Sequence, residues 1–152
     1  MILVVCLDDP KLLKKAEKQS SQDRIMFGDC HVLKFRGSLP PKLGISENLF
    51  VTAHGSCDWE AKNAVIGDRG NTTYYFNGVD FYNRIKNIFP TDYRGNVYIS
   101  ACESADYPWD CFSFIEVFKS QIDVDYNVSV YGQKGKVGYA IPYPNASIWI
   151  EA

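Results

Sequence analysis

The chain has 152 residues, a formal net charge of −2 and an aromatic content of 14%. This length predicts one domain, residues 1–152, with a core large enough to be stable without disulfides or a structural metal. The nearly balanced charge argues against nucleic acid or an anionic membrane as a partner.

The sequence contains five cysteines and two histidines, and no cysteines have the Cys-x-x-Cys spacing. An odd number of thiols argues against a disulfide framework, and the two histidines show no zinc-ligand pattern, so we expect no metal and no cofactor. Unpaired thiols are typical of a reducing compartment, and no apolar run approaches the ~20 residues of a membrane helix. We therefore expect a cytoplasmic protein.

The first residues predict a strand followed by a capped helix. Residues 2–7 are apolar, lack a basic leader and end at Asp8-Asp9-Pro10. This pattern indicates a buried strand and a turn, and not a signal peptide. Asp8 or Asp9 is expected to cap a helix over about residues 10–20, with Pro10 in its first turn.

Strands and helices alternate along the rest of the chain. Helices are expected over 77–88, with an inner face of Val79, Tyr82, Ile85, Lys86 and Phe89, and over 109–121, with Phe112, Ile115, Val117 and Phe118 on its apolar side. Strands are expected at 30–35, 48–53, 64–66, 72–76, 96–101, 128–131, 137–141 and 147–150. The alternation predicts an α/β fold, a three-layer sandwich with a mostly parallel central sheet flanked by helices.

Two of the expected strands are followed directly by residues that can take part in catalysis. Residues 48–53 lead directly to His54 and Gly55, and residues 96–101 lead directly to Cys102. The carboxyl ends of parallel strands meet at one edge of a sheet, where ligands bind. The sequence therefore predicts a thiol and an imidazole at one site, although a buried, inert thiol is the usual fate of a single cysteine.

This pair has the composition of a cysteine nucleophile with a histidine base. A free thiol has a pKa of about 8.5 and is mostly protonated at neutral pH, and a nearby histidine can take its proton. Gly55 lets the backbone approach a ligand closely, so the amides of Gly55 and Cys102 are candidates for an oxyanion hole. The other histidine, His31, lies at the start of a strand and is expected to be structural or exposed.

Two segments resemble motifs of the caspase-like (clan CD) cysteine peptidases: Thr52-Ala53-His54-Gly55 and Ile99-Ser100-Ala101-Cys102-Glu103-Ser104. Their residues are most similar to those of CHAT-type domains. The resemblance covers about residues 45–132. It implies a mostly parallel sheet with helices on both faces, His54 as general base or imidazolium partner and Cys102 as the acylated nucleophile. It also implies a protein or peptide substrate, and it allows an activator such as calcium or a small anion. The compact chain suits a bacterial effector or accessory protein.

Substrate preference stays open at this point. Asp58, Glu60 and Asp68 after the histidine, or Glu103 and Asp106 after the cysteine, would favour a basic side chain before the scissile bond, whereas Lys134 or Lys136 would favour an acidic one. For each of these acids, a solvated loop charge is the simpler explanation.

Two other functions fit the same sequence. The fold can serve as a non-catalytic interaction or regulatory module, because a fold does not determine a function. A receiver-like or flavodoxin-like signalling domain is the other alternative, in which Asp8 and Asp9 would bind magnesium.

Overall fold

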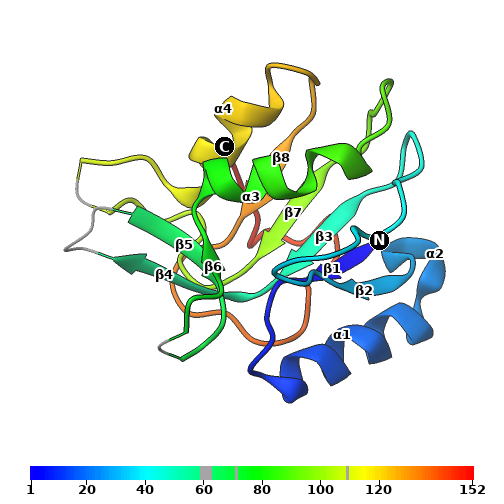
Figure 1. Cartoon of the computed structure of the whole chain (residues 1–152), viewed down its shortest axis with the longest axis horizontal. Helices are drawn as coiled ribbons and strands as arrows, with labels where there is room; N and C mark the ends of the chain where they lie inside the picture. Colours follow the sequence, from blue (N-terminus) through cyan, green and yellow to red (C-terminus); the bar gives the residue numbers. More distant parts are fainter. Residues whose placement is uncertain (59–62, 71, 109) are drawn as a thin grey trace.

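A six-stranded sheet forms the centre of the molecule, in the order β2-β1-β3-β7-β8-β9 (Figure 1). The computed structural model describes residues 1–58, 63–70, 72–108 and 110–152. All neighbours in the sheet pair in parallel except β9, which runs antiparallel to β8. The strands are β1 (Ile2–Val4), β2 (Cys30–Val32), β3 (Leu49–Thr52), β7 (Val97–Ser100), β8 (Val130–Gly132) and β9 (Ile150–Glu151). The predicted α/β class with a mostly parallel sheet is confirmed.

Helices cover both faces of this sheet. On one face, α1 (Pro10–Gln22) and α2 (Arg24–Phe27) pack against Ile2, Val4 and Phe50. On the other face, α3 (Gly78–Ile85), the short 3-10 helix η1 (Lys86–Ile88) and α4 (Phe114–Ile122) pack against the strand residues of opposite parity. Figure 1 shows α1 on the side of the sheet opposite to α3 and α4. Burial on both faces explains why the central strands are continuous apolar runs.

Side-chain caps determine where the helices begin. Asp9 caps α1 and accepts hydrogen bonds from two amides of the first turn, as one of the two predicted capping residues. Ser113 and Glu116 form a reciprocal capping box at α4. This box starts the helix later than the predicted residue 109, and it leaves Phe112 exposed outside the helix.

The inner face predicted for the helix at 77–88, which corresponds to α3, was partly wrong. Val79 and Lys86 are exposed, whereas Phe81, Tyr82 and Ile85 are buried. The helix begins at Gly78 after its cap Asn77, close to the predicted start, and its buried stripe includes Phe81, which packs against the rings of Phe114 and Phe118. No helix in the described parts of the chain is long and apolar enough to cross a membrane.

A second, antiparallel sheet leaves the main sheet at the end of β3. It consists of β4 (His54–Asp58), β5 (Asn63–Gly67) and β6 (Tyr75–Phe76). The predicted strands at 64–66 and 72–76 correspond to β5 and to the shorter β6, and residue 71 between them lies outside the described residues. β4 was not predicted, because its five residues have no apolar alternation and the strand depends on pairing with β5.

The predicted strand at 137–141 does not form. Its backbone is hydrogen bonded to side chains instead: the Val137 amide donates to the Cys102 sulfur and the Ile141 amide donates to Gln19. Pro142 and Pro144 follow, and proline supplies no backbone donor to a sheet. The last predicted strand is reduced to Ile150–Glu151.

Candidate active site

The main sheet places the residues that follow β3 and β7 at the same height along the strands. Each β3 residue pairs with the β7 residue 48 positions later, so that Thr52 lies beside Ser100. The same separation relates His54 to Cys102, and each follows its strand by two residues. Both residues line one cavity of about 430 Å³. The edge of the sheet therefore places the thiol and the imidazole at a common cavity.

Cys102 lies on a tight turn directly after β7. The next residue, Glu103, has a positive φ of 58°, a conformation that a residue with a side chain adopts at a cost. The thiol is partly buried, and the Val137 amide donates a hydrogen bond to its sulfur at 3.3 Å. The turn thus presents the sulfur to the cavity, with the segment after β8 passing beside it.

Two serines of the second motif fasten this turn to the rest of the fold. The Ser100 hydroxyl donates to the buried side chain of Gln133. The Ser104 hydroxyl accepts the Gln133 amide at 2.9 Å and lies 3.2 Å from the carbonyl of Ile99. Ser104 and Gln133 are almost fully buried. These polar residues have a structural role, since they hold the turn that carries the cysteine.

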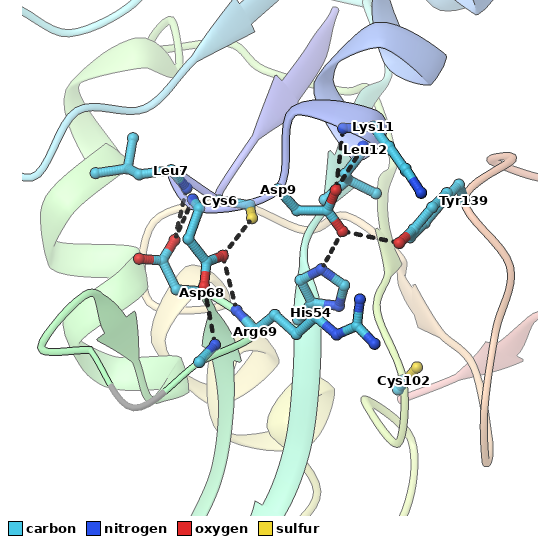
Figure 2. A network of polar contacts seen from close by, with 12 residues as sticks. Cys6, Leu7, Asp9, Lys11, Leu12, His54, Asp68, Arg69, Cys102 and Tyr139 are labelled. Carbon is cyan, nitrogen blue, oxygen red and sulfur yellow. Dashed lines mark hydrogen bonds and ion pairs between the residues drawn. The ribbon is translucent and has the colours of Figure 1, made fainter.

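His54 is held by an acidic residue from the first strand end. Its Nε2 lies 2.9 Å from Oδ2 of Asp9, and their side chains are only 20% and 8% exposed. The Tyr139 hydroxyl donates to the same carboxylate oxygen at 2.8 Å. The other oxygen of Asp9 accepts the amides of Lys11 and Leu12 (Figure 2). One carboxylate therefore caps α1 and orients the histidine.

This orientation determines which ring nitrogen is available. A neutral imidazole that donates from Nε2 to Asp9 presents Nδ1 as a proton acceptor. In the described residues no hydrogen bond joins His54 to Cys102, although both face the same cavity. Hydrogen bonds in catalytic sites often shorten only when substrate binds, so this separation is compatible with proton transfer.

Asp9 was one of the two predicted caps, but its pairing with His54 was not predicted. The signal was available in part, because β1 is the direct neighbour of β3 and an acid at its end reaches the same sheet edge. Tyr139 was also missed, since it lies within residues 137–141, which the sequence predicted as a strand. It contacts Asp9 across 130 positions of the chain.

The hydrogen bonds to Asp9 predict a specific loss of stability in acid. Burial raises the pKa of Asp9, but the hydrogen bonds from Tyr139, His54 and two amides outweigh it and lower the pKa to about 2. An unfolded aspartate has a pKa of about 3.9. Its contribution to the free energy of unfolding is therefore complete above about pH 4 and is lost as the pH falls toward 2. Denaturant unfolding between pH 2 and 6 should show a smaller decline for Asp9→Asn than for the wild type. Equal declines would contradict this role of the carboxylate.

The backbone of Gly55 touches the backbone of Cys102. A Cβ atom at Gly55 would lie 3.1 Å from both the carbonyl carbon and the nitrogen of Cys102, and closer still to its carbonyl oxygen. The Cys102 amide is not used in any hydrogen bond of the described residues. The two backbone segments expected to supply oxyanion donors are thus in direct contact at the cavity.

The acids predicted as substrate contacts already have partners. Glu103 lines the cavity, but its carboxylate accepts the Cys57 amide at 2.8 Å. Asp106 accepts the Gly135 amide at 2.7 Å. The side chain of Asp58 and the whole of Glu60 lie outside the described residues. Each of the two described carboxylates therefore has a structural role in addition to its charge.

Three other cysteines are poorly suited to nucleophilic attack. Burial raises the pKa of Cys6 to about 12 and the pKa values of Cys30 and Cys57 to about 11. A thiol with such a pKa is almost entirely protonated at neutral pH. Cys111 precedes the capping box of α4 and does not line the cavity. Cys102 is the cysteine that the fold presents at the cavity with His54.

The second predicted acid of the first turn, Asp8, serves a separate network. Its carboxylate accepts the amides of Arg69 and Gly70, both at 2.9 Å, while Asp68 accepts the amides of Leu7 and Asp8. The two loops are thus joined by reciprocal hydrogen bonds (Figure 2). Asp8 and Asp9 face different partners, which is not the arrangement expected of a shared magnesium site.

Comparison of the chain with protein-family models, with curated proteins and with solved structures finds no match. Its function is therefore inferred from the arrangement of His54, Asp9 and Cys102. Three neighbouring strands, β1, β3 and β7, lead to these three residues at one sheet edge.

Proposed function

We propose that the protein is a cysteine endopeptidase with a three-layer, caspase-like architecture, in which Cys102 is the nucleophile and His54 the general base. The observation that carries the proposal is the common cavity lined by both residues, with Nε2 of the histidine already bound to Asp9. An oriented base and a thiol that line the same cavity are the components that nucleophilic catalysis requires. Asp9 and Tyr139 act as positioning residues.

The proposed mechanism transfers one proton back and forth. Nδ1 of His54 takes the thiol proton, and the thiolate of Cys102 attacks the peptide carbonyl carbon. The amides of Gly55 and Cys102 stabilise the oxyanion, and the imidazolium then protonates the leaving amine. Water, activated by the same histidine, hydrolyses the thioester and restores the thiol. These steps use only side chains, backbone amides and water.

A non-catalytic interaction module is the second candidate. The Val137 amide donates a hydrogen bond to the sulfur of Cys102, and the described residues include no hydrogen bond from His54 to this sulfur. In an enzyme, the segment around Val137 has to move aside when the substrate binds at Cys102, whereas in an interaction module it stays in place. The five free cysteines suit a reducing compartment such as the cytoplasm under either function.

Alkylation of the native protein tests the proposed nucleophile. With limiting iodoacetamide at neutral pH, we expect Cys102 to be modified at least about tenfold faster than Cys57, because buried thiols are protonated and inaccessible. Peptide mass mapping identifies the modified residue. His54→Ala should remove most of this advantage, whereas the matched variant His31→Ala should retain it.

The peptidase proposal fails if Cys102 reacts no faster than the partly buried Cys111, or reacts only after unfolding. It also fails if His31→Ala slows the reaction as much as His54→Ala does. In that case the interaction module becomes the better explanation of the fold.

A further inference from the structure

One segment crosses the candidate active site without belonging to a helix or a strand. It follows β8, and its residues 136–139 line the cavity together with Cys102. We propose that residues 136–140, which we call the strap, form an autoinhibitory element that keeps peptide substrates away from Cys102 and that Gln19 of α1 holds closed. This inference rests on the proposed function and adds the regulation of the same site.

The strap meets the sulfur of Cys102 with its main chain. The Val137 amide donates a hydrogen bond to the sulfur at 3.3 Å, and the sulfur lies 3.9 Å from the Val137 carbonyl oxygen. A substrate carbonyl carbon has to come within about 3–3.5 Å of the attacking atom. The strap backbone already lies at this distance, so a peptide reaches the sulfur only after the strap has moved.

The second contact of the strap is with the residue that orients His54. The Tyr139 hydroxyl donates to Oδ2 of Asp9 at 2.8 Å, beside the His54 ring (Figure 2). The tyrosine and histidine rings meet edge to face, with their centroids 6.2 Å apart. Between described residues, the hydrogen bonds of the strap go to Cys102 and Asp9 and to no other residue. The strap therefore contacts both the proposed nucleophile and the acid that positions the base.

The chain is fastened on both sides of the strap. The Gly135 carbonyl accepts the Glu103 amide at 2.8 Å, and the Gly135 amide donates to Asp106 at 2.7 Å. At the other end, the side chain of Gln19 donates to the Ile141 carbonyl at 2.9 Å and accepts the Ile141 amide at 2.8 Å. One side chain of α1 thus binds both backbone groups of Ile141, and this clasp holds the strap across the cavity.

The strap has few packing contacts that would resist its displacement. Lys136, Gly138 and Ala140 are exposed, and Val137 and Tyr139 are half-buried. Among the strap residues, Tyr139 alone packs against a core cluster. Segments with few buried apolar contacts open at a low free energy, while the rest of the fold stays intact. The strap can therefore open without unfolding of the sheet or the helices.

The rate at which Cys102 is alkylated measures whether the strap is closed. In Gln19→Ala, which lacks the clasp, we expect iodoacetamide to react with Cys102 about tenfold faster than in the wild type, because two hydrogen bonds of typical net strength are lost. Val137→Pro should also raise the rate, since proline has no amide to bind the sulfur. Gln121→Ala is the matched control on α4, where the side chain donates to the neighbouring Ser120. Its rate should stay within about twofold of the wild type.

The rate at Cys57 shows whether a variant has loosened the whole fold. Cys57 is buried and does not line the cavity, so its rate should stay unchanged while that of Cys102 rises. In a His54→Ala background, opening of the strap should raise the Cys102 rate by the same factor, because it removes an obstacle and not a base. An unchanged Cys102 rate in both Gln19→Ala and Val137→Pro would overturn the inference. An equal rise at Cys57 and Cys102 would overturn it as well.

Cleavage of one peptide substrate by the wild type and by Gln19→Ala keeps the two proposals apart. We expect cleavage about tenfold faster in the variant, for the same two hydrogen bonds. Faster alkylation of Cys102 without cleavage by either protein contradicts the peptidase alone. Cleavage by the wild type as fast as by Gln19→Ala contradicts inhibition by the strap alone.

Discussion

Replacing Cys102 with alanine is expected to abolish peptide cleavage, with kcat/KM reduced by roughly 10⁴-fold to 10⁶-fold. The fold presents this thiol together with His54 at the cavity, and no other described cysteine shares that position. His54→Ala should reduce kcat by about 10²-fold to 10⁴-fold, the usual contribution of a general base. The free energy of unfolding should change far less than the activity.

The measurement is the initial rate of cleavage of one peptide substrate by each variant. The double variant, with both Cys102→Ala and His54→Ala, should be no slower than Cys102→Ala alone. The effects of substituting residues that act as one unit are strongly non-additive. Cys111→Ala and His31→Ala are the matched controls and should retain activity within about twofold of the wild type, since neither residue lines the cavity. Activity that survives in Cys102→Ala would exclude this residue as the nucleophile.

Gly55→Ala is expected to lower the free energy of unfolding by about 3 kcal/mol or more, at the upper end of overpacking in a core. The added methyl group would overlap the carbonyl oxygen of Cys102 and lie 3.1 Å from its carbon and nitrogen. Backbone atoms cannot move aside as a flexible side chain can. The substitution should therefore push β4 away from the turn that carries the thiol, and reduce alkylation of Cys102 as well.

Gly138→Ala provides the matched control for this prediction. Gly138 lines the same cavity, but a Cβ atom there would meet no atom within 4 Å. We expect a change of less than about 1 kcal/mol, and a slight gain is reasonable because alanine restricts the unfolded chain. Denaturant unfolding of both variants measures the difference. Similar stabilities for the two would contradict the close approach of Gly55 to Cys102.

The parts of the fold that the sequence predicted have strong local signals. The apolar runs that became β3 and β7 are buried on both faces, and the Asp9-Pro10 pair begins α1 as the capping pattern indicates. The common cavity of His54 and Cys102 follows from the same reasoning, because parallel strands end at one edge. Local pattern and sheet topology were sufficient for these features.

The parts that were missed depend on contacts between distant residues. The partner of His54 lies 45 positions away, and Tyr139 reaches the same carboxylate across 130 positions. Residues 137–141 have the composition of a strand, but tertiary hydrogen bonds to Cys102 and Gln19 replace the ladder. No local periodicity encodes these pairings, so propensity alone could not reveal them.

The segment after β8 couples the site to α1. Val137 contacts the thiol, Tyr139 contacts Asp9, and Ile141 is tied to Gln19 of α1 through two hydrogen bonds. The three residues that this segment binds belong to three different parts of the fold. A displacement of residues 137–141 would therefore release the sulfur of Cys102, the carboxylate of Asp9 and the side chain of Gln19 together.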